Sequence, residues 1–238
     1  MAAKRKRRTG TLMHRVAIAM AVCMSASALL VGLFRWVDPP TSAFMIEHWV
    51  AGRLASGRAP EVHHEWTDWS SIPPAVKLAV IAAEDQRFPR HRGFDAVEIR
   101  RALQQHLEGG RLRGASTITQ QTAKNLFLWS GRDPLRKGLE AWFTLLIEGL
   151  WSKERILEVY LNIAQLGPDT FGVGAASWRY FDRPVVALDA QDAALIAAVL
   201  PNPNVYRLDA PSTSVRRREA WIRGQMSRLG GIAYLNAL

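Results

Sequence analysis

The sequence has a single cysteine, Cys23, among its 238 residues. One cysteine excludes an intrachain disulfide and a metal site built from several cysteines, so the fold must be held by packing. Strand patterns are nearly absent as well, and no internal repeat is visible. Hydrophobic residues make up 48% of the chain and charged residues 22%. The chain therefore suits one sizeable, mostly α-helical domain with an appendage.

Acidic residues are missing before Asp38, and the charge is consequently uneven along the chain. The first fifteen residues hold six basic side chains, namely Lys4, Arg5, Lys6, Arg7, Arg8 and Arg15. The net charge of the whole chain is +10, so the remainder carries 10 − 6 = +4. A mildly basic body of this kind suits anionic partners such as phosphate groups, acidic lipid headgroups or nucleic acid.

Residues 16–34 form a run of 19 positions without a charge. At about 1.5 Å per helical residue, this run spans roughly the 30 Å hydrocarbon core of a bilayer. We expect a transmembrane anchor at 16–37, with the basic tail 1–15 in the cytoplasm and the body outside. A cleaved signal peptide is the alternative, since residues 25–28 are small. The apolar run continues past them, however, and exceeds the usual signal core of about 7–15 residues, which favours an uncleaved anchor.

Residues 38–65 are predicted to be an irregular or weakly helical connector, in which His63-His64 forms a solvated loop. From residue 66 the pattern becomes helical, with Ser70 or Ser71 as a cap and Pro73-Pro74 in the first turn. Caps and breakers predict one helix that ends near Asp85. They predict further helices at 96–107, 135–150, 153–162, 189–200 and 212–229. Small residues at 171–181 permit close packing.

A cluster of charged residues, EDQRFPRHRGFD at 84–95, follows an apolar run at 76–83 that is broken only by Lys77. Burial raises the pKa of a carboxylic acid, and a nearby cation lowers it. Glu84 is exposed to both effects, which is how a carboxylate is tuned to move protons near neutral pH. The alternative is a helix end that carries solvated charges.

Two further polar segments suit sugar hydroxyls and phosphate oxygens. The first is the loop at 114–121, which is followed by Lys124 and Asn125 and is no Walker loop; the alternative is an ordinary Ser/Thr/Gln loop. In the second, Arg136 and Glu140 share a helix face, although a simple salt bridge would explain them too. Residues 153–162 mainly build the core, through Ile156, Leu157, Tyr160 and Leu161.

Four blocks now stand in order: EDQRFPRHRGFD, GASTITQQTAKNLF, RKGLE and KERILEVYLN. They resemble the signature motifs of the peptidoglycan glycosyltransferases of glycosyltransferase family 51, over roughly residues 66–205. The first block matches Glu-Asp-x-x-Phe-x-x-His-x-Gly-x-Asp at every fixed position, and the second matches through Lys124 and Asn125. Departures follow the third block, where Thr144 replaces a frequent alanine and Ile147 a usual leucine. Both are packing positions.

The resemblance implies a lysozyme-like helical catalytic domain at 66–238, with a smaller flexible lobe and a cleft between the lobes. Enzymes of this family transfer the growing lipid-linked glycan to the 4-hydroxyl of lipid II, with inversion and release of polyprenyl pyrophosphate. The implied partners are lipid II, the growing glycan strand, membrane lipids and other cell-wall synthesis or division proteins, but no nucleic acid. The implied location is the bacterial inner membrane, in a single pass with the catalytic domain on the periplasmic side.

Chemistry and the resemblance together assign expected roles. Glu84 is the general base, and Glu140 is the second essential glutamate, which orients cations or the donor sugar. The cations expected at the pyrophosphate are Lys124, Arg132, Arg136 and Lys137. Residues expected to bind substrate or shape the cleft are Ser116, Thr117, Gln120, Gln121 and Asn125. Residues expected to build the first motif's turn are Asp85, Phe88, His91, Gly93 and Asp95.

Two expectations concern the surroundings of this site. A divalent cation, Mg²⁺ or Mn²⁺, would suit the pyrophosphate, but the sequence shows no dedicated ligand cluster for it. The apolar run at 126–129 either dips into the membrane interface or belongs to the core.

Alternative functions were compared with this one. Neither the Ser-x-x-Lys nor the Lys-Thr-Gly motif of transpeptidases occurs, so we expect a monofunctional enzyme. A peptidoglycan-cleaving lysozyme or lytic transglycosylase is the main alternative, but its leaving group carries no phosphate to explain the basic set beside Glu140. A membrane scaffold without catalysis is the third possibility.

Overall fold

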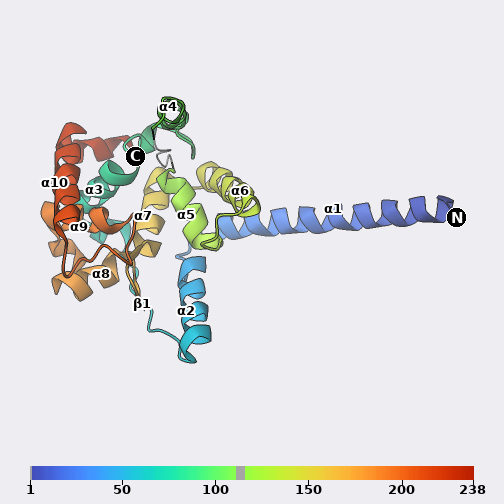
Figure 1. Cartoon of the computed structure of the whole chain (residues 1–238), viewed down its shortest axis with the longest axis horizontal. Helices are drawn as coiled ribbons and strands as arrows, with labels where there is room; N and C mark the ends of the chain where they lie inside the picture. Colours follow the sequence, from blue (N-terminus) through green and yellow to red (C-terminus); the bar gives the residue numbers. More distant parts are fainter. Residues whose placement is uncertain (1, 111–115) are drawn as a thin grey trace. The chain divides into compact units, whose positions relative to one another are not determined.

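The structure is a computed structural model that describes residues 2–110 and 116–238, with side chains from residue 13 onward. Gly114 and Ala115 of the polar loop lie outside the described residues, as do the side chains of the basic residues at 4–8. The chain divides into two compact units, Met1–Asp38 and Pro39–Leu238. Both are drawn in Figure 1, and each is described by itself.

The first unit is built on one helix, α1 (Ala2–Leu33). Its segment Met13–Leu33 is 21 residues long and is long and apolar enough to cross a membrane. The predicted span at 16–34 lies almost wholly within it. The helix ends in a turn in which the backbone N–H of Trp36 donates to the carbonyl of Leu33 at 3.1 Å.

The second unit begins with α2 (Ala43–Ser56), in the segment expected to be a connector. Ser42 caps this helix, since its side chain accepts from the backbone N–H of Met45 at 3.2 Å. Gly57 ends it in the left-handed conformation, with φ of 72°. The segment is thus more regular than the sequence indicated, because its caps outweigh its weak apolar periodicity.

A small sheet contradicts the prediction of a solvated loop at His63-His64. These two residues are β1 (His63–His64), which runs parallel to β3 (Thr170–Phe171); β2 (Gln165–Gly167) pairs with β3 in antiparallel register. The Nε2 atom of His64 lies 3.1 Å from the carbonyl oxygen of Asn162, and burial lowers the pKa of this histidine. Strands of two or three residues carry too little alternation to be recognised in a sequence.

One helical group consists of α3 (Pro74–Glu84), α9 (Ala190–Val199) and α10 (Thr213–Arg228), which pack on one another. Figure 1 shows them side by side on the left. Asp189 caps α9 and Ser212 caps α10, at the residues with which the two predicted helices begin. The predicted cap at Ser70 or Ser71 is wrong, because these residues form a short 3₁₀ turn, η1 (Trp69–Ser71), and α3 starts after Pro73 without a side-chain cap.

The second helical group consists of α5 (Ile118–Phe127), α6 (Pro134–Leu150) and α7 (Lys153–Ile163), with α8 (Gly172–Phe181) packed on α7. The predicted packing face of α7 is confirmed, since Ile156, Leu157, Tyr160 and Leu161 are all buried. In α5, Leu126 is buried, and so is Leu128 just after the helix, while Trp129 is exposed. The apolar run at 126–129 therefore belongs mainly to the core.

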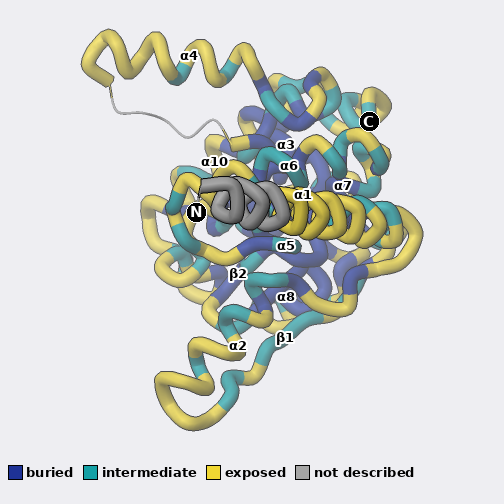
Figure 2. Tube along the Cα trace, turned by 90° about the vertical axis from the view of Figure 1, so that its right-hand side faces the viewer, coloured by how far each residue is buried: buried dark blue, intermediate teal, exposed yellow. Residues whose placement is uncertain are grey.

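The remaining elements are α4 (Ala96–Leu107) and the 3₁₀ turns η2 (Phe88–Arg90), η3 (Val185–Ala187) and η4 (Gly231–Ala237). The bounds of α4 agree with the prediction. Figure 2 shows that α4 is largely exposed, whereas the helices around α3, α5 and α7 hold the buried core. The predicted mostly helical fold is confirmed.

Candidate active site

Glu84 is the last residue of α3, and polar side chains from the predicted site segments lie around it. A cavity of about 420 Å³ is lined by Glu84 together with Ser116 and Thr117, two of the predicted substrate-binding residues. The lining also includes Trp221 and Gln225 of α10. The side chain of Glu84 is only 14% exposed at this cavity.

Both carboxylate oxygens of Glu84 have a hydrogen-bond donor. Nε2 of Gln121 donates to Oε2 at 3.0 Å, and the guanidinium of Arg218 donates to Oε1 at 3.3 Å. Burial raises the pKa of Glu84, and this effect outweighs the lowering by Gln121, Arg218 and the more distant Lys124. The site therefore holds a carboxylate whose proton affinity is higher than usual, as a general base for neutral pH requires.

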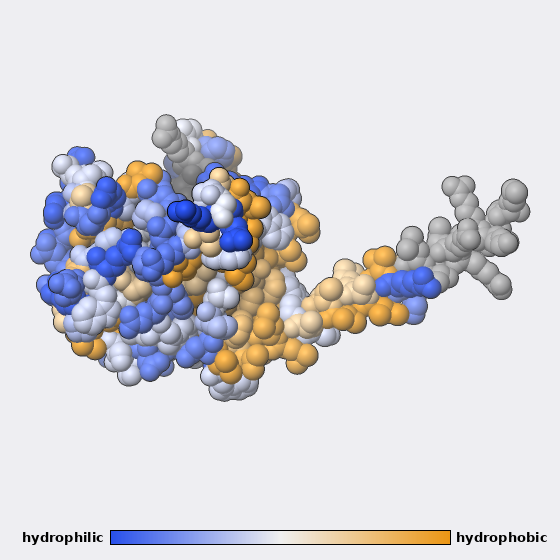
Figure 3. Space-filling model, turned by 90° about the horizontal axis from the view of Figure 1, so that it is seen from below, coloured by the Kyte–Doolittle hydropathy of each residue, from blue (hydrophilic) through white to orange (hydrophobic). Residues whose placement is uncertain are grey.

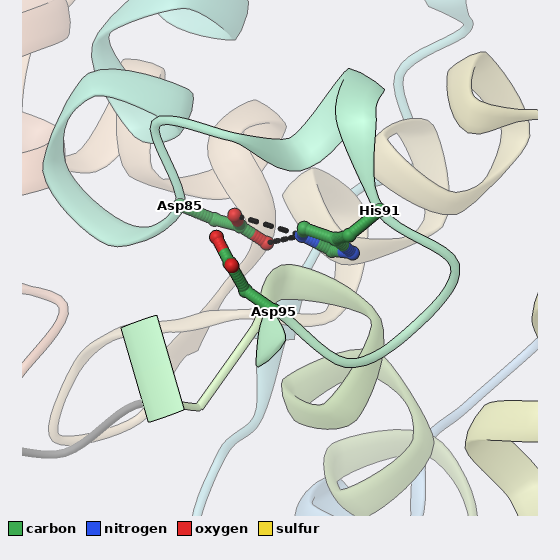
Figure 4. A group of neighbouring side chains, drawn as sticks. All are labelled: Asp85, His91 and Asp95. Carbon is green, nitrogen blue, oxygen red and sulfur yellow. Dashed lines mark hydrogen bonds and ion pairs between the residues drawn. The ribbon is translucent and has the colours of Figure 1, made fainter. Parts of the chain in front are cut away.

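The turn after Glu84 is joined to α5 by Asp85. Figure 4 shows the ring of His91 facing the carboxylate of Asp85, and its Nε2 lies 2.9 Å from Oδ1. The backbone N–H of Ile118 donates to Oδ2 of Asp85 at 3.0 Å. Since Ile118 is the first residue of α5, one buried carboxylate fixes the position of this helix relative to α3.

Asp95, Phe88 and Gly93 complete the turn. Asp95 caps α4 by accepting from the backbone N–H groups of Val97 and Glu98 at 2.9 and 3.1 Å. Phe88 is fully buried. Gly93 has φ of +82°, and a Cβ there would lie 2.7 Å from Cγ2 of Thr144. Only glycine fits this position without strain.

Asp85, His91 and Asp95 place one ligand atom each within 4.8 Å of one another, an arrangement that could in principle hold a metal ion. Most of their polar atoms are used otherwise, although Nδ1 of His91 has no hydrogen-bond partner among the described residues. Asp85 binds His91 and Ile118, and Asp95 caps α4 while Arg87 lies 3.1 Å from its Oδ2 atom. All three are also buried. The group thus fits a hydrogen-bonded turn and not the divalent cation that a pyrophosphate would need, and we derive no step through a metal.

Glu140 in α6 is the centre of a second charged group. Its Oε2 accepts from Arg136 at 2.7 Å, and its Oε1 forms an ion pair with Lys137. The side chains of Arg136 and Glu140 are buried, at 9% and 4% exposed, whereas that of Lys137 is 54% exposed. The predicted shared helix face of Arg136 and Glu140 is therefore present.

Adjacent glutamines of α5 connect the two glutamates. Gln121 donates to Glu84, and Nε2 of Gln120 lies 3.5 Å from Oε1 of Glu140. Gln120 also forms a capping box with Thr117, whose hydroxyl donates to the carbonyl of Gly93 at 2.6 Å. Both residues are buried and hydrogen-bonded within the protein, whereas Ser116 is exposed.

Lys124 lies between the two charged groups. Its ammonium interacts electrostatically with both Glu140 and Glu84, and burial lowers its pKa. Its Nζ is 5.3 Å from the ring centroid of Phe44 in α2. In the next residue of the chain, the buried Asn125, Oδ1 has no hydrogen-bond partner among the described residues. Arg132 is exposed and, within the described part of the chain, forms no ion pair.

Three residues at this site were not predicted to act there. Arg218 reaches Glu84 from α10, the hydroxyl of Tyr160 donates to Oε1 of Gln121 at 2.9 Å, and Glu148 accepts from Thr119 and Lys153 at 2.5 and 2.8 Å. The run of arginines at 216–218 was the available signal for Arg218. Tyr160 was placed in the core by its spacing, which says nothing about its hydroxyl.

Fold and site together define a mostly helical protein with two buried glutamates, each paired with basic side chains, and with Lys124 interacting with both. The family model described as Transglycosylase matches residues 52–227. The chain is 51% identical over 228 residues to a biosynthetic peptidoglycan transglycosylase of Pseudomonas putida (strain W619), covering 96% of each chain. Proteins of the same name from Pseudomonas aeruginosa and Xylella fastidiosa (strain 9a5c) are 51% and 48% identical, over 89% and 94% of this chain and 91% and 92% of theirs.

This chain belongs to the transglycosylase family. The match begins at residue 52, inside α2, so it includes part of the segment that the sequence left as a connector.

Proposed function

We propose that this protein polymerises the glycan chains of peptidoglycan. The growing lipid-linked glycan is the donor, and the 4-hydroxyl of lipid II is the acceptor. The observation that carries this function is the buried Glu84, held in the same site as the cations beside Glu140. The names of the related proteins support the same reaction.

Glu84 acts as the general base. The acceptor oxygen forms a bond to the anomeric carbon of the donor, its proton passes to Glu84, and the bond from that carbon to the pyrophosphate breaks. An alcohol is a weak nucleophile, so proton removal in the transition state accelerates attack. The raised pKa of Glu84 suits this role, because a base with a pKa nearer to the working pH accepts the proton more readily.

Lys124, Arg136 and Lys137 stabilise the leaving pyrophosphate. The negative charge on that group grows as the bond breaks, and cations already held in place stabilise it without reorganisation. Glu140 supplies this preorganisation, since it pairs with Arg136 and Lys137 at once. Arg132 and the open amide oxygen of Asn125 are further candidates for substrate contact, as are Ser116, Thr117, Gln120 and Gln121.

The membrane location follows from the substrate. We propose that α1 anchors the protein in the bacterial inner membrane, with its N-terminus in the cytoplasm and the second unit on the periplasmic side. In that unit, α2 carries the exposed side chains Ile46, Trp49, Val50 and Leu54. Figure 3 views the molecule from the side on which α2 lies and shows hydrophobic side chains gathered there. A polyprenyl chain that stays in the bilayer would meet such a surface.

The test compares two substrates. Purified full-length protein in detergent receives labelled lipid II in one reaction and intact peptidoglycan sacculi in another. We expect polymer from lipid II and no release of soluble fragments from sacculi. Release of soluble muropeptides without polymer would establish the cleaving alternative, and inactivity toward both would favour a scaffold.

A further inference from the structure

We propose that Tyr160 is a positioning residue for Glu84, acting through the side-chain amide of Gln121. The inference rests on the proposed function, since it takes Glu84 as the base of the transfer. Tyr160 would not touch the substrate. Its role would be to decide which face of the Gln121 amide meets the carboxylate.

The geometry is a chain of two hydrogen bonds that starts in the core. Tyr160 in α7 is 1% exposed, and its hydroxyl donates to Oε1 of Gln121 at 2.9 Å. Nε2 of the same amide donates to Oε2 of Glu84 at 3.0 Å. The three side chains come from α7, α5 and α3, so the chain joins both helical groups at the reacting carboxylate.

An amide has one face that accepts and one face that donates hydrogen bonds. Because the Tyr160 hydroxyl occupies the oxygen, the NH₂ group of Gln121 is turned toward Glu84. The opposite orientation would place the amide oxygen against a carboxylate oxygen. Burial raises the pKa of Tyr160 well above its usual range, so its O–H remains a donor at neutral pH.

Charged and titratable groups from several elements face the carboxylate of Glu84. Arg218 approaches from α10, Lys124 from α5 and Tyr160 from α7, while Asp85 is the next residue in the chain. Arg218 bonds Oε1 and Gln121 bonds Oε2, so the two donors divide the two oxygens between them. This arrangement fixes the plane of the carboxylate and leaves each oxygen a lone pair for the incoming proton.

The direct test is Tyr160→Phe, which removes the O–H and keeps the buried ring. We expect kcat for lipid II polymerisation to fall about five- to tenfold, as for the loss of one hydrogen bond, with KM little changed. In this variant the NH₂ group of Gln121 is no longer held toward Glu84. The carboxylate of Glu84 therefore loses a hydrogen-bond donor that stabilises its charged form. The acid limb of the kcat–pH profile therefore moves to higher pH.

A double-mutant cycle separates positioning from packing. Gln121→Met removes both faces of the amide, so adding Tyr160→Phe to it should lower kcat no further. The matched control is Tyr180→Phe, which removes a hydroxyl that lies 3.1 Å from Thr170 and should leave the kcat–pH profile unchanged. Melting temperatures are measured for each variant.

Two outcomes overturn the inference. One is a Tyr160→Phe profile that matches the wild type, and the other is an effect fully additive with Gln121→Met. If Tyr160→Phe does not fold, an unshifted acid limb in Gln121→Met overturns the inference by itself. A wild-type protein that makes no polymer would instead refute the proposed function, so the two failures are distinguishable.

Discussion

Arg218 and Glu84 form an ion pair of 3.3 Å between Nη2 and Oε1, although 134 residues separate them in the chain. The contact exists because α10 packs on α3, so that the last long helix supplies a cation to the end of the first buried helix of the second unit. Arg218 favours the charged form of Glu84 against the effect of burial. The balance of these two effects sets how readily Glu84 accepts a proton.

Replacing Arg218 should change that balance. In Arg218→Gln the pKa of Glu84 rises, because a cation that stabilises the carboxylate is lost. The acid limb of the kcat–pH profile should move to higher pH, whereas Arg218→Lys retains the charge and should move it less. The control is Arg217→Gln, at the exposed neighbouring position. Identical profiles for Arg218→Gln and wild type would show that the ion pair does not tune the base.

Replacing Glu84 should affect stability in a pH-dependent way. Burial raises its pKa above the ordinary value of 4.5, so ionisation of Glu84 costs folding free energy. The contribution of Glu84 to stability is therefore complete below about pH 4.5 and is lost as pH rises through the folded pKa. Glu84→Gln avoids this loss. Its melting temperature minus that of the wild type should therefore increase as the pH rises from 4.5 to 8. A difference that shrinks with rising pH would contradict the direction of the shift.

The ion pairs of Glu140 should differ in their effect on stability. Glu140→Gln leaves the buried guanidinium of Arg136 without its counter-charge, which should cost about 3 kcal/mol. Lys137→Ala removes a half-exposed partner of the same carboxylate and should cost less than about 1 kcal/mol. Urea denaturation measures both. Equal losses would mean that burial does not distinguish the two pairs.

Replacing Gly93 with alanine should destabilise the protein far more than replacing Gly109 with alanine. Both have positive φ, +82° and +85°, so alanine brings backbone strain of about 1 kcal/mol or more at either position. A Cβ on Gly93 would also lie 2.7 Å from Cγ2 of Thr144, whereas nothing lies within 4 Å at Gly109. Gly93→Ala should therefore lose about 1–3 kcal/mol more than Gly109→Ala.

Thr144→Ser provides the complementary check on this contact. It removes Cγ2 and keeps the hydroxyl that donates to the carbonyl of Glu140 at 2.6 Å. Thr144→Ser should recover part of the stability lost in Gly93→Ala. If it recovers none, then the contact with Thr144 is not the cause of the loss.

Local signals explain how much of the fold could be predicted. Ser152 caps the helix predicted to follow it, and Asp189 and Ser212, with which two other predicted helices begin, cap α9 and α10; capping depends on residues two or three positions apart. The sheet that contains His63 and His64 could not be predicted, since its pairing partners lie at 170 and 171. Pairings over such distances leave no pattern within either short strand.

The candidate site divides in the same way. Arg136 and Glu140 were identified as neighbours, because a spacing of four residues places them on one helix face. The contacts of Arg218 and Tyr160 with the Glu84 network depend on the packing of helices far apart in sequence. Periodicity marked Tyr160 as a core residue but could not indicate where its hydroxyl would point.

The central claim is that Glu84 is the base of a glycan-polymerising reaction. It is tested most directly by the initial rate of lipid II polymerisation for the wild type, Glu84→Gln and Glu108→Gln, the last being an exposed glutamate outside the site. We predict a loss of at least about 100-fold in Glu84→Gln, with an undiminished melting temperature, and no loss in Glu108→Gln. Polymerisation by Glu84→Gln at close to the wild-type rate would contradict the account.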